Sequence, residues 1–247
     1  MKNPIIVALT IAFLTSSAFA DENHAIHQKG AVISDTDSKT TEAFDILAAH
    51  VHSNGNTVTF HMTTRGVAGA EVPLPLGTLA GASAYVYVWP TSMDASTVGF
   101  DEGAGILAMV AATHPDFDDT PLFDENSDGN TNNDGGQWHS HWVVLAPTEA
   151  CGPGALAVKD IPEGTTPNLP VTWPGLPILL DSPGFTPIFD GAEVTLNAAV
   201  KGGAKGVSYD GVTAALRVNK NIHSPLFCVI DIFDIASGDL SLPGNVN

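Results

Sequence analysis

Two short alternating runs, residues 43–52 and 57–63, flank Asn54-Gly55 and constrain the fold more than any other feature. Asn-Gly between alternating runs is the strongest short-range signal for a β-hairpin with a two-residue type I′ turn. Because side chains alternate between the two faces of a strand, one face of this hairpin is apolar and belongs to a core. The residues of that face are Leu47, Ala49, Val51, Val58, Phe60 and Met62. The hairpin therefore predicts an antiparallel sheet with one buried face.

The rest of the chain repeats this pattern of short strand-like runs between turn residues. Further strands are expected near residues 84–90, 105–110, 138–145, 193–200, 214–218 and 226–232. The 24 Gly and 17 Pro fall without a period, which favours many short strands and turns over helices. The prediction is an all-β, single-domain antiparallel β-sandwich with long loops over residues 21–247, in which the polar residues 21–40 form a flexible N-terminal segment.

The first twenty residues have the pattern of a secretory signal peptide. Lys2 precedes an apolar run at residues 5–14, and Ala18-Phe19-Ala20 matches an A-x-A cleavage site. The apolar run is short for a bilayer span. We therefore expect residues 1–20 to be removed and the mature protein to be exported, either periplasmic or secreted, without membrane insertion.

The two cysteines of the chain, Cys151 and Cys228, form no C-x-x-C pair. Exported proteins reach oxidising compartments, where a single disulfide between these residues is expected. A two-cysteine metal site is the alternative.

The chain is strongly acidic. Its formal net charge is −18, and the loss of Lys2 with the signal peptide makes it −19. A polyanion of this kind attracts cations and is repelled by nucleic acid and by anionic membrane surfaces, which excludes nucleic acid as a partner. The acidity also serves solubility, and the sequence identifies no protein partner. Metal ions are the partners that we expect.

Two His-x-His pairs, His50-Val51-His52 and His139-Ser140-His141, lie in strand-like segments. Alternate residues of a strand project from one face, so each pair presents neighbouring imidazoles, which suit zinc, copper, iron and nickel. In the predicted hairpin register, His61 lies diagonally from His50 on the same face. The candidate metal ligands are therefore His139, His141, His50, His52 and His61. The two pairs form either one shared site or two separate sites.

The second pair has a pocket-like setting. On the predicted strand over residues 138–145, one face carries Trp138, Ser140, Trp142 and Val144 and is interpreted as a packing face. The two histidines share the other face with Val143 and Leu145, which places the imidazoles at the rim of a partly buried pocket. Apolar surroundings favour metal binding because they control the access of solvent to the ion.

Residues 137–142, Gln-Trp-His-Ser-His-Trp, resemble the zinc-binding strand of the α-class carbonic anhydrases, in which His-x-His followed by Trp supplies two zinc ligands. The resemblance implies a third histidine and an open water position, at which zinc lowers the pKa of the water to about 7. It covers six residues, and the other patterns of that family are not evident around them. The resemblance thus supports the geometry of a three-histidine site and not membership of the family.

Residues 124–130 match the opening of a calcium-binding loop, D-x-[DN]-x-[DN]-G. Gly135 occupies the place of the closing Glu of an EF-hand, so other oxygens would have to complete the shell. The candidate calcium ligands are Asp124, Asn126, Asp128, Asn130 and Asp134. A bound calcium ion is expected to order the connection into the strand of His139, and the alternative is a solvated acidic loop.

These patterns predict an exported metal-binding protein that holds copper or zinc through strand-borne histidines, with a possible structural calcium loop. One alternative is a zinc-dependent lyase or hydrolase with three histidine ligands and an open water position, for which the sequence names no general base. Another is a surface interaction module without a metal. His114 and His223 are isolated in loop-like sequence and are not favoured as ligands. We find no G-x-S-x-G elbow, phosphate-binding loop or dinucleotide motif.

Overall fold

The computed structural model describes residues 29–78, 80–114, 129–130, 136–221 and 223–247. The strands are β1 (Val32–Ile33), β2 (Ile46–Asn54), β3 (Thr57–Thr64), β4 (Ser83–Pro90), β5 (Ile106–Thr113), β6 (His139–Pro147), β7 (Leu156–Val158), β8 (Leu180–Asp181), β9 (Ile188–Asp190), β10 (Glu193–Ala199), β11 (Ser208–Tyr209), β12 (Val212–Val218), β13 (Phe227–Ile235) and β14 (Gly244–Asn245). Two short 3-10 helices, η1 (Ala95–Val98) and η2 (Glu149–Cys151), complete the elements of these ranges. The strand pairings are antiparallel, which confirms the predicted all-β antiparallel class.

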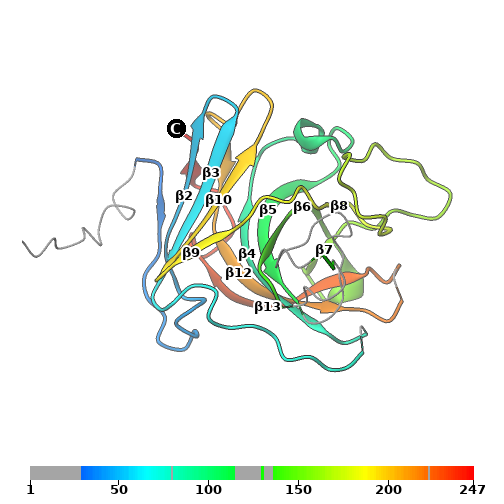
Figure 1. Cartoon of the computed structure of the whole chain (residues 1–247), viewed down its shortest axis with the longest axis horizontal. Coiled ribbons are helices and arrows are strands. Elements are labelled where there is room, and N and C mark those ends of the chain that lie inside the picture. Colours follow the sequence, from blue (N-terminus) through cyan, green and yellow to red (C-terminus); the bar gives the residue numbers. More distant parts are fainter. Residues whose placement is uncertain (1–28, 79, 115–128, 131–135, 222) are drawn as a thin grey trace, which may run out of the picture.

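The strands form two main sheets that lie side by side (Figure 1). Five strands pair in the order β1-β2-β3-β10-β9, and seven pair in the order β5-β4-β12-β13-β7-β6-β8. β5 also pairs with β6, so six strands of the second sheet close into a barrel. The sequence predicts sheets packed face to face, and the closure of one sheet into a barrel goes beyond that prediction.

Two apolar cores lie on opposite sides of the barrel wall. Alternate residues of a barrel strand belong to different cores: on β4, Trp89 faces the five-stranded sheet, whereas Val86 and Val88 face the barrel interior. In the outer core, the ring of Phe60 on β3 lies 5.9 Å from Trp89 and 5.7 Å from Trp142, between ring centroids. The outer core therefore fixes the five-stranded sheet against the barrel, and the inner core lines the barrel itself.

β2 and β3 form the predicted hairpin, with a register shifted by two residues. Asn54 pairs with Thr57, so the loop is Gly55-Asn56 rather than Asn54-Gly55. Gly55 has a φ of 59° and Asn56 has no positive φ, which matches a type II′ turn rather than the expected type I′. An even shift keeps each side chain on its predicted face. It places His50 directly opposite His61 instead of diagonally from it.

The buried face of the hairpin is close to the predicted one. Five of the six expected core residues are buried, and Leu47 is half-buried. An irregularity in the pairing between Ile46 and Ala48 explains this difference, because the extra residue of a bulge leaves the ladder and Ile46 takes the buried place.

The predicted disulfide between Cys151 and Cys228 is present, with the Cα atoms 5.5 Å apart. It joins η2, just after β6, to β13, and a disulfide indicates a compartment outside the reducing cytoplasm. The predicted signal peptide, residues 1–20, lies outside the described residues, which begin at residue 29. In the described part of the chain, no helix has the length and apolar character needed to cross a membrane.

Candidate metal centre

Three histidines meet at one end of the β5–β6 pair. His139 and His141 lie on β6, and His114 directly follows β5. One potential ligand nitrogen of each histidine lies within 4.8 Å of the other two. Within the described ranges, no other group of three His, Cys, Asp or Glu side chains comes together in this way.

The register of β5 against β6 produces this arrangement. Ala112 pairs with His139, and Val110 pairs with His141. Since alternate residues of a strand share a face, His114 follows Val110 and Ala112 on the interior face of the barrel and lies diagonally from His139. The ring of His139 is 4.7 Å from the ring of His114 and 4.7 Å from that of His141, between centroids.

Contacts with backbone oxygens orient the two rings of β6. Nδ1 of His139 lies 3.0 Å from the carbonyl oxygen of Gln137, and Nδ1 of His141 lies 3.3 Å from that of Asp181. A carbonyl oxygen only accepts hydrogen bonds, so we assign the proton of each ring to Nδ1. Nε2 then carries the lone pair that a metal ion needs.

The Nε2 atoms of His114 and His139 lie 3.1 Å apart. Two nitrogens bound to a tetrahedral zinc ion at their usual bond lengths are about 3.3 Å apart. The pair therefore already has the spacing of metal ligands, and without a metal the same distance suits an N–H···N hydrogen bond.

β8 supports His141 from the side. Asp181 of β8 pairs with Trp142 of β6, and Oγ of Ser182 lies 3.2 Å from Nδ1 of His141. Burial raises the pKa of the Asp181 carboxyl group, and a hydrogen bond of 2.7 Å from Thr172 Oγ1 partly opposes this effect. The backbone oxygen of Asp181 and the hydroxyl of Ser182 thus form an outer layer that holds the ring of His141.

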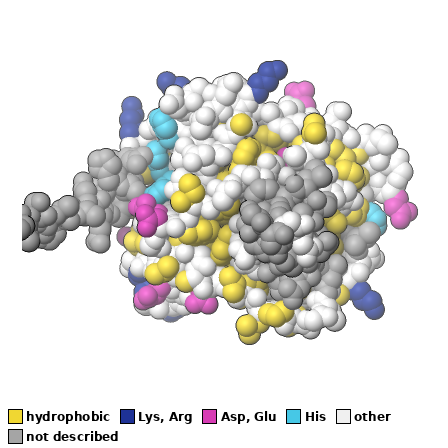
Figure 2. All heavy atoms as spheres, viewed as in Figure 1, with side chains coloured by type: hydrophobic (Ala, Val, Ile, Leu, Met, Phe, Trp, Pro, Cys, Tyr) yellow, Lys and Arg dark blue, Asp and Glu magenta, His cyan; other side chains and the backbone are white. Residues whose placement is uncertain are grey.

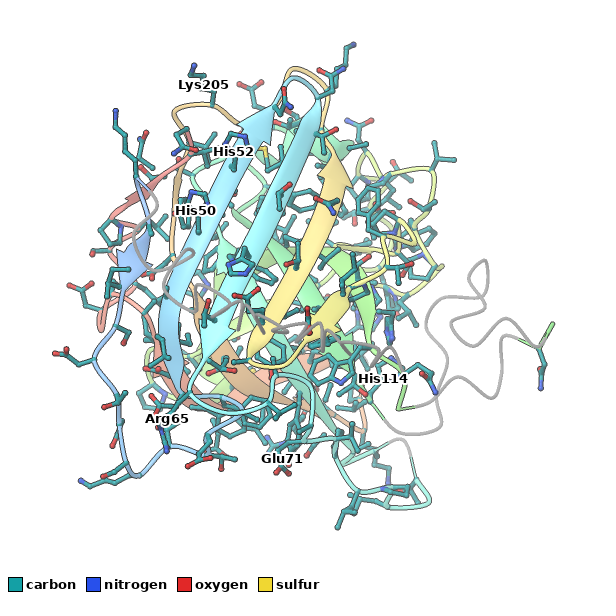
Figure 3. All side chains as sticks on the ribbon, turned by 60° about the vertical axis from the view of Figure 1, so that its left-hand side comes forward. His50, His52, Arg65, Glu71, His114 and Lys205 are labelled. Atoms are coloured by element: carbon teal, nitrogen blue, oxygen red, sulfur yellow. A yellow bond between two sulfur atoms is a disulfide. The ribbon has the colours of Figure 1, made fainter. Side chains whose placement is uncertain are left out.

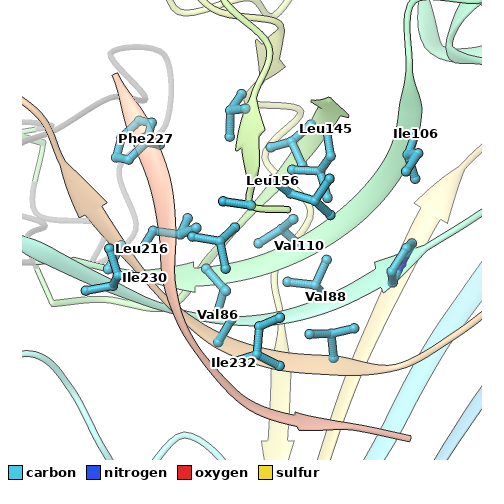
Figure 4. Close-up of a pocket in the computed structure, with 18 of the residues that line it drawn as sticks. Val86, Val88, Ile106, Val110, Leu145, Leu156, Leu216, Phe227, Ile230 and Ile232 are labelled. Carbon is cyan, nitrogen blue, oxygen red and sulfur yellow. The ribbon is translucent and has the colours of Figure 1, made fainter. Parts of the chain in front are cut away.

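The histidine group is buried and adjoins a cavity. The exposed fractions of His114, His139 and His141 are 3%, 2% and 3%. His114 and His141 line a cavity of about 640 Å³ inside the barrel, together with Val143 and Leu145 (Figure 4). His141 therefore has the pocket setting that the sequence predicts for the second His-x-His pair, whereas His139 is buried and is not among the described residues that line the cavity.

The hairpin histidines lie elsewhere. His50, His52 and His61 share the face of β2–β3 that points away from the barrel, whereas the opposite face of the hairpin packs in the outer core. Figure 3 places His50 and His52 on β2 and far from His114, and histidine side chains are visible at the surface on this side of the molecule in Figure 2. The two His-x-His pairs therefore do not share one site, and metal binding by the hairpin histidines stays a prediction.

Each hairpin histidine has its own surroundings. Nδ1 of His52 lies 2.8 Å from Oδ1 of Asn247, and Nε2 of His61 lies 3.4 Å from a carboxylate oxygen of Glu193. His50 is 5% exposed, and burial, followed by the neighbouring His61 and His52, lowers its pKa. The ring centroids of His50 and His52 are 6.5 Å apart. This distance is longer than the 4.7 Å that separates the neighbouring rings of the group formed by His114, His139 and His141.

Sequence reasoning did not favour His114, because the predicted strand over residues 105–110 stops four residues before it. β5 extends to Thr113. The alternation of Val110 and Ala112, continued by one step, reaches His114, and this continuation was the signal in the sequence that identifies the third histidine.

The predicted calcium loop lies almost entirely outside the described residues. Four of the five candidate ligands lie outside the described residues: Asp124, Asn126, Asp128 and Asp134. The fifth, Asn130, is described and is exposed. The amide of Gly136 donates a hydrogen bond to the carbonyl oxygen of His114, so the ends of this connection meet beside the histidine group. Calcium binding stays a prediction.

Comparison with known proteins gives no match: no family model fits the chain, and no curated protein or solved structure is significantly similar to it. The function must therefore be argued from the site itself.

Proposed function

We propose that this chain is an exported metal-binding protein that holds one copper or zinc ion through His114, His139 and His141. The observation that carries the proposal is the meeting of three buried imidazoles, with one potential ligand atom of each within 4.8 Å of the other two. Imidazole nitrogen suits both ions. The backbone contacts at Nδ1 of His139 and His141 support ligation through Nε2, because such contacts fix the orientation of ligand rings.

The cavity supports an enzyme as the second candidate. Three imidazoles leave the fourth position of a tetrahedral ion to another ligand, and a zinc-bound water there has a pKa of about 7. Because His114 and His141 line the cavity, this position is reached from the barrel interior. Among the described residues that line the cavity, Asp231 is the single carboxylate, and it is exposed on β13. A buried general base is thus lacking in that set, so metal binding is the first proposal and a zinc-dependent lyase or hydrolase is the second.

The metal proposal is tested by measuring the metal content of untagged protein after loading with copper or zinc and dialysis. The protein is expected to retain one tightly bound ion, and the His139→Ala, His141→Ala double variant is expected to lose it. His223→Ala is the matched control, because His223 binds the carboxylate of Asp160 away from the centre. Wild-type protein that retains no ion would contradict both the metal-binding protein and the zinc-dependent enzyme. The surface interaction module without a metal would then be the remaining candidate.

The same preparations separate the two metal-based candidates. Hydrolysis of p-nitrophenyl acetate that requires zinc and disappears in the double variant favours the enzyme. A zinc-loaded protein that is inactive and does not exchange a ligand with azide favours binding or transfer of the ion.

For the acidic connection, we propose a structural calcium ion held by Asp124, Asn126, Asp128, Asn130 and Asp134. Oxygen ligands at alternate positions support calcium, and the hydrogen bond between Gly136 and His114 brings the ends of this connection to the metal centre. Calcium is expected to raise the melting temperature of the wild type. The same rise in an Asp124→Ala, Asp128→Ala variant would contradict the proposal.

Export to the periplasm or the exterior is supported by the disulfide and by the signal-peptide pattern of residues 1–20. Sequencing of the mature amino terminus is expected to begin at Asp21. A mature protein that begins at Met1 would contradict export by this route.

A further inference from the structure

The barrel interior holds a large apolar cavity (Figure 4), and His114 and His141 of the histidine group are among the residues that line it. Among the described residues that line it, only His114, His141 and Asp231 carry a polar side chain. The other lining residues are mainly Val, Leu, Ile and Ala, with the single aromatic ring of Phe227, and they include no Lys or Arg.

A hollow of this size is unusual for a barrel of six strands. Small barrels are normally filled by their own side chains, and protein interiors contain few voids larger than a water molecule. Here Ala84, Ala112 and Ala214 face the interior where larger side chains would fill it. The volume of about 640 Å³ lies in the range of pockets that bind small organic molecules. Apolar cavities are poor sites for water, so an apolar occupant suits the interior.

The wall of the cavity also departs from regular structure. The register shifts of β13 against β12 leave Ile230 outside the ladder, so the adjacent residues Val229 and Ile230 both line the cavity. Ile230 and Ile232, which also lines it, are 38% and 51% exposed. Leu240 and Leu242, which also line it, have φ values of 58° and 53°. Leucine rarely adopts this left-handed conformation, and such strain gathers at binding sites and functional segments.

We propose that the barrel cavity binds an aliphatic molecule with one terminal donor group that coordinates the metal ion on His114, His139 and His141. The donor part of this inference rests on the proposed metal centre. An aliphatic body matches the aliphatic lining, and the lack of a cationic side chain among the described lining residues leaves the metal as the partner of the polar end. The ion and the cavity would together select chain-like ligands over small polar ones.

The test uses cobalt(II) in place of the native ion, because its visible spectrum responds to a new ligand. Acetohydroxamate and octanohydroxamate share one donor group and differ only in their aliphatic tails. Each buried methylene strengthens binding by about fourfold. Octanohydroxamate is therefore expected to change the spectrum at concentrations more than about tenfold below those needed for acetohydroxamate. Equal affinities would overturn the proposal.

A cavity-filling variant locates the tail. Ala214 lies on β12, which is adjacent to neither β5 nor β6 in the sheet, so Ala214→Phe should retain cobalt and lose the preference for octanohydroxamate. Leu216→Trp, at a less buried lining position, replaces it if Ala214→Phe does not fold. Val171→Phe is the control, since Val171 is 99% exposed and outside the cavity. A preference that persists in the filled variant would overturn the proposal.

Failure of the metal centre is distinguishable from failure of the cavity. If the protein retains no cobalt, the proposed function and the donor contact both fail, and the apolar probe N-phenyl-1-naphthylamine then tests the cavity in metal-free protein. Fluorescence enhancement by the wild type and by Val171→Phe, but not by Ala214→Phe, supports an aliphatic binding cavity. No enhancement by the wild type overturns the cavity as well.

Discussion

Nε2 of His114 lies 3.1 Å from Nε2 of His139, although the two residues are 25 positions apart in the sequence. The pairing of β5 with β6 creates this proximity, because Ala112 lies opposite His139, and His114, two residues after Ala112 and just past the end of β5, continues the same face. The third histidine of the group, His141, is on β6 itself. A centre held in this way depends on the register of two paired strands, which is more rigid than a loop.

The hydroxyl of Ser182 should tune the metal centre without binding the ion. Its Oγ lies 3.2 Å from Nδ1 of His141. Loss of an outer contact to a ligand ring typically weakens metal binding by about tenfold or more. Ser182→Ala is therefore expected to raise the dissociation constant for zinc by about tenfold, measured by competition with a chromophoric chelator. Ser224→Ala, far from the centre along the chain, is the control, and equal affinities of the two variants would contradict this role.

The disulfide should contribute a large part of the stability. Cys151 and Cys228 are 77 residues apart, and in the chain-entropy description a cross-link of this span destabilises the unfolded chain by about 4.5 kcal/mol. The Cys151→Ser, Cys228→Ser variant is expected to lose about that much free energy of unfolding in urea. Reduction of the wild type should produce the same loss, whereas a reductant should not change the variant. A loss well below 1 kcal/mol would contradict the expectation.

The stability of the metal-free protein should fall in mild acid because of His50. Burial, then His61 and His52, lower the pKa of His50 from 6.5, and a contact with the backbone of Lys29 opposes them. A base with a lowered pKa binds fewer protons in the folded state than in the unfolded state. The titration of His50 therefore does not change the free energy of unfolding above pH 6.5. As the pH falls from 6.5 toward the pKa of His50 in the folded state, this titration lowers the free energy of unfolding.

His50→Gln should reduce this decrease. Urea unfolding at about pH 7.5 and 5.5, with a chelator present, is expected to give a smaller difference for His50→Gln than for the wild type. Val171→Ala, which removes no titratable group from a position that is 99% exposed, should behave like the wild type. The same pH difference in all three proteins would show that His50 titrates normally in the fold.

The sequence was sufficient for the fold class, the hairpin and the disulfide, because each depends on local patterns or on a single possible pairing. The sequence also predicted which residues share each face of β6, because side chains alternate along a strand: Trp142 packs in the outer core and Val143 in the inner one. It did not predict the barrel, because the pairing of β5 with β6 across a long connection has no local signature. The hairpin register was wrong by two residues because Gly55-Asn56 competes with Asn54-Gly55 for the turn.

The hairpin histidines should be dispensable for the tightly bound ion. His50 and His52 lie on the five-stranded sheet, and the group on β5 and β6 contains neither. A His50→Ala, His52→Ala variant is expected to retain the tight ion after dialysis and to lose any weaker second ion that the wild type binds. Isothermal titration with zinc measures both. Loss of the tight ion in this variant would assign the metal centre to the hairpin instead.

His114 provides the sharpest test of the centre, because its loop-like sequence did not favour it as a ligand and the structure brings it to the other two histidines. His114→Ala is expected to weaken metal binding as strongly as His139→Ala, since either change leaves two imidazoles where three meet. His223→Ala removes a histidine that is equally isolated in the sequence but lies 3.0 Å from a carboxylate oxygen of Asp160, and it should bind metal like the wild type. Circular dichroism of the metal-free variants checks that the fold is intact. A His114→Ala protein that is folded and binds zinc with unchanged affinity would contradict ligation by His114 and with it the three-histidine centre.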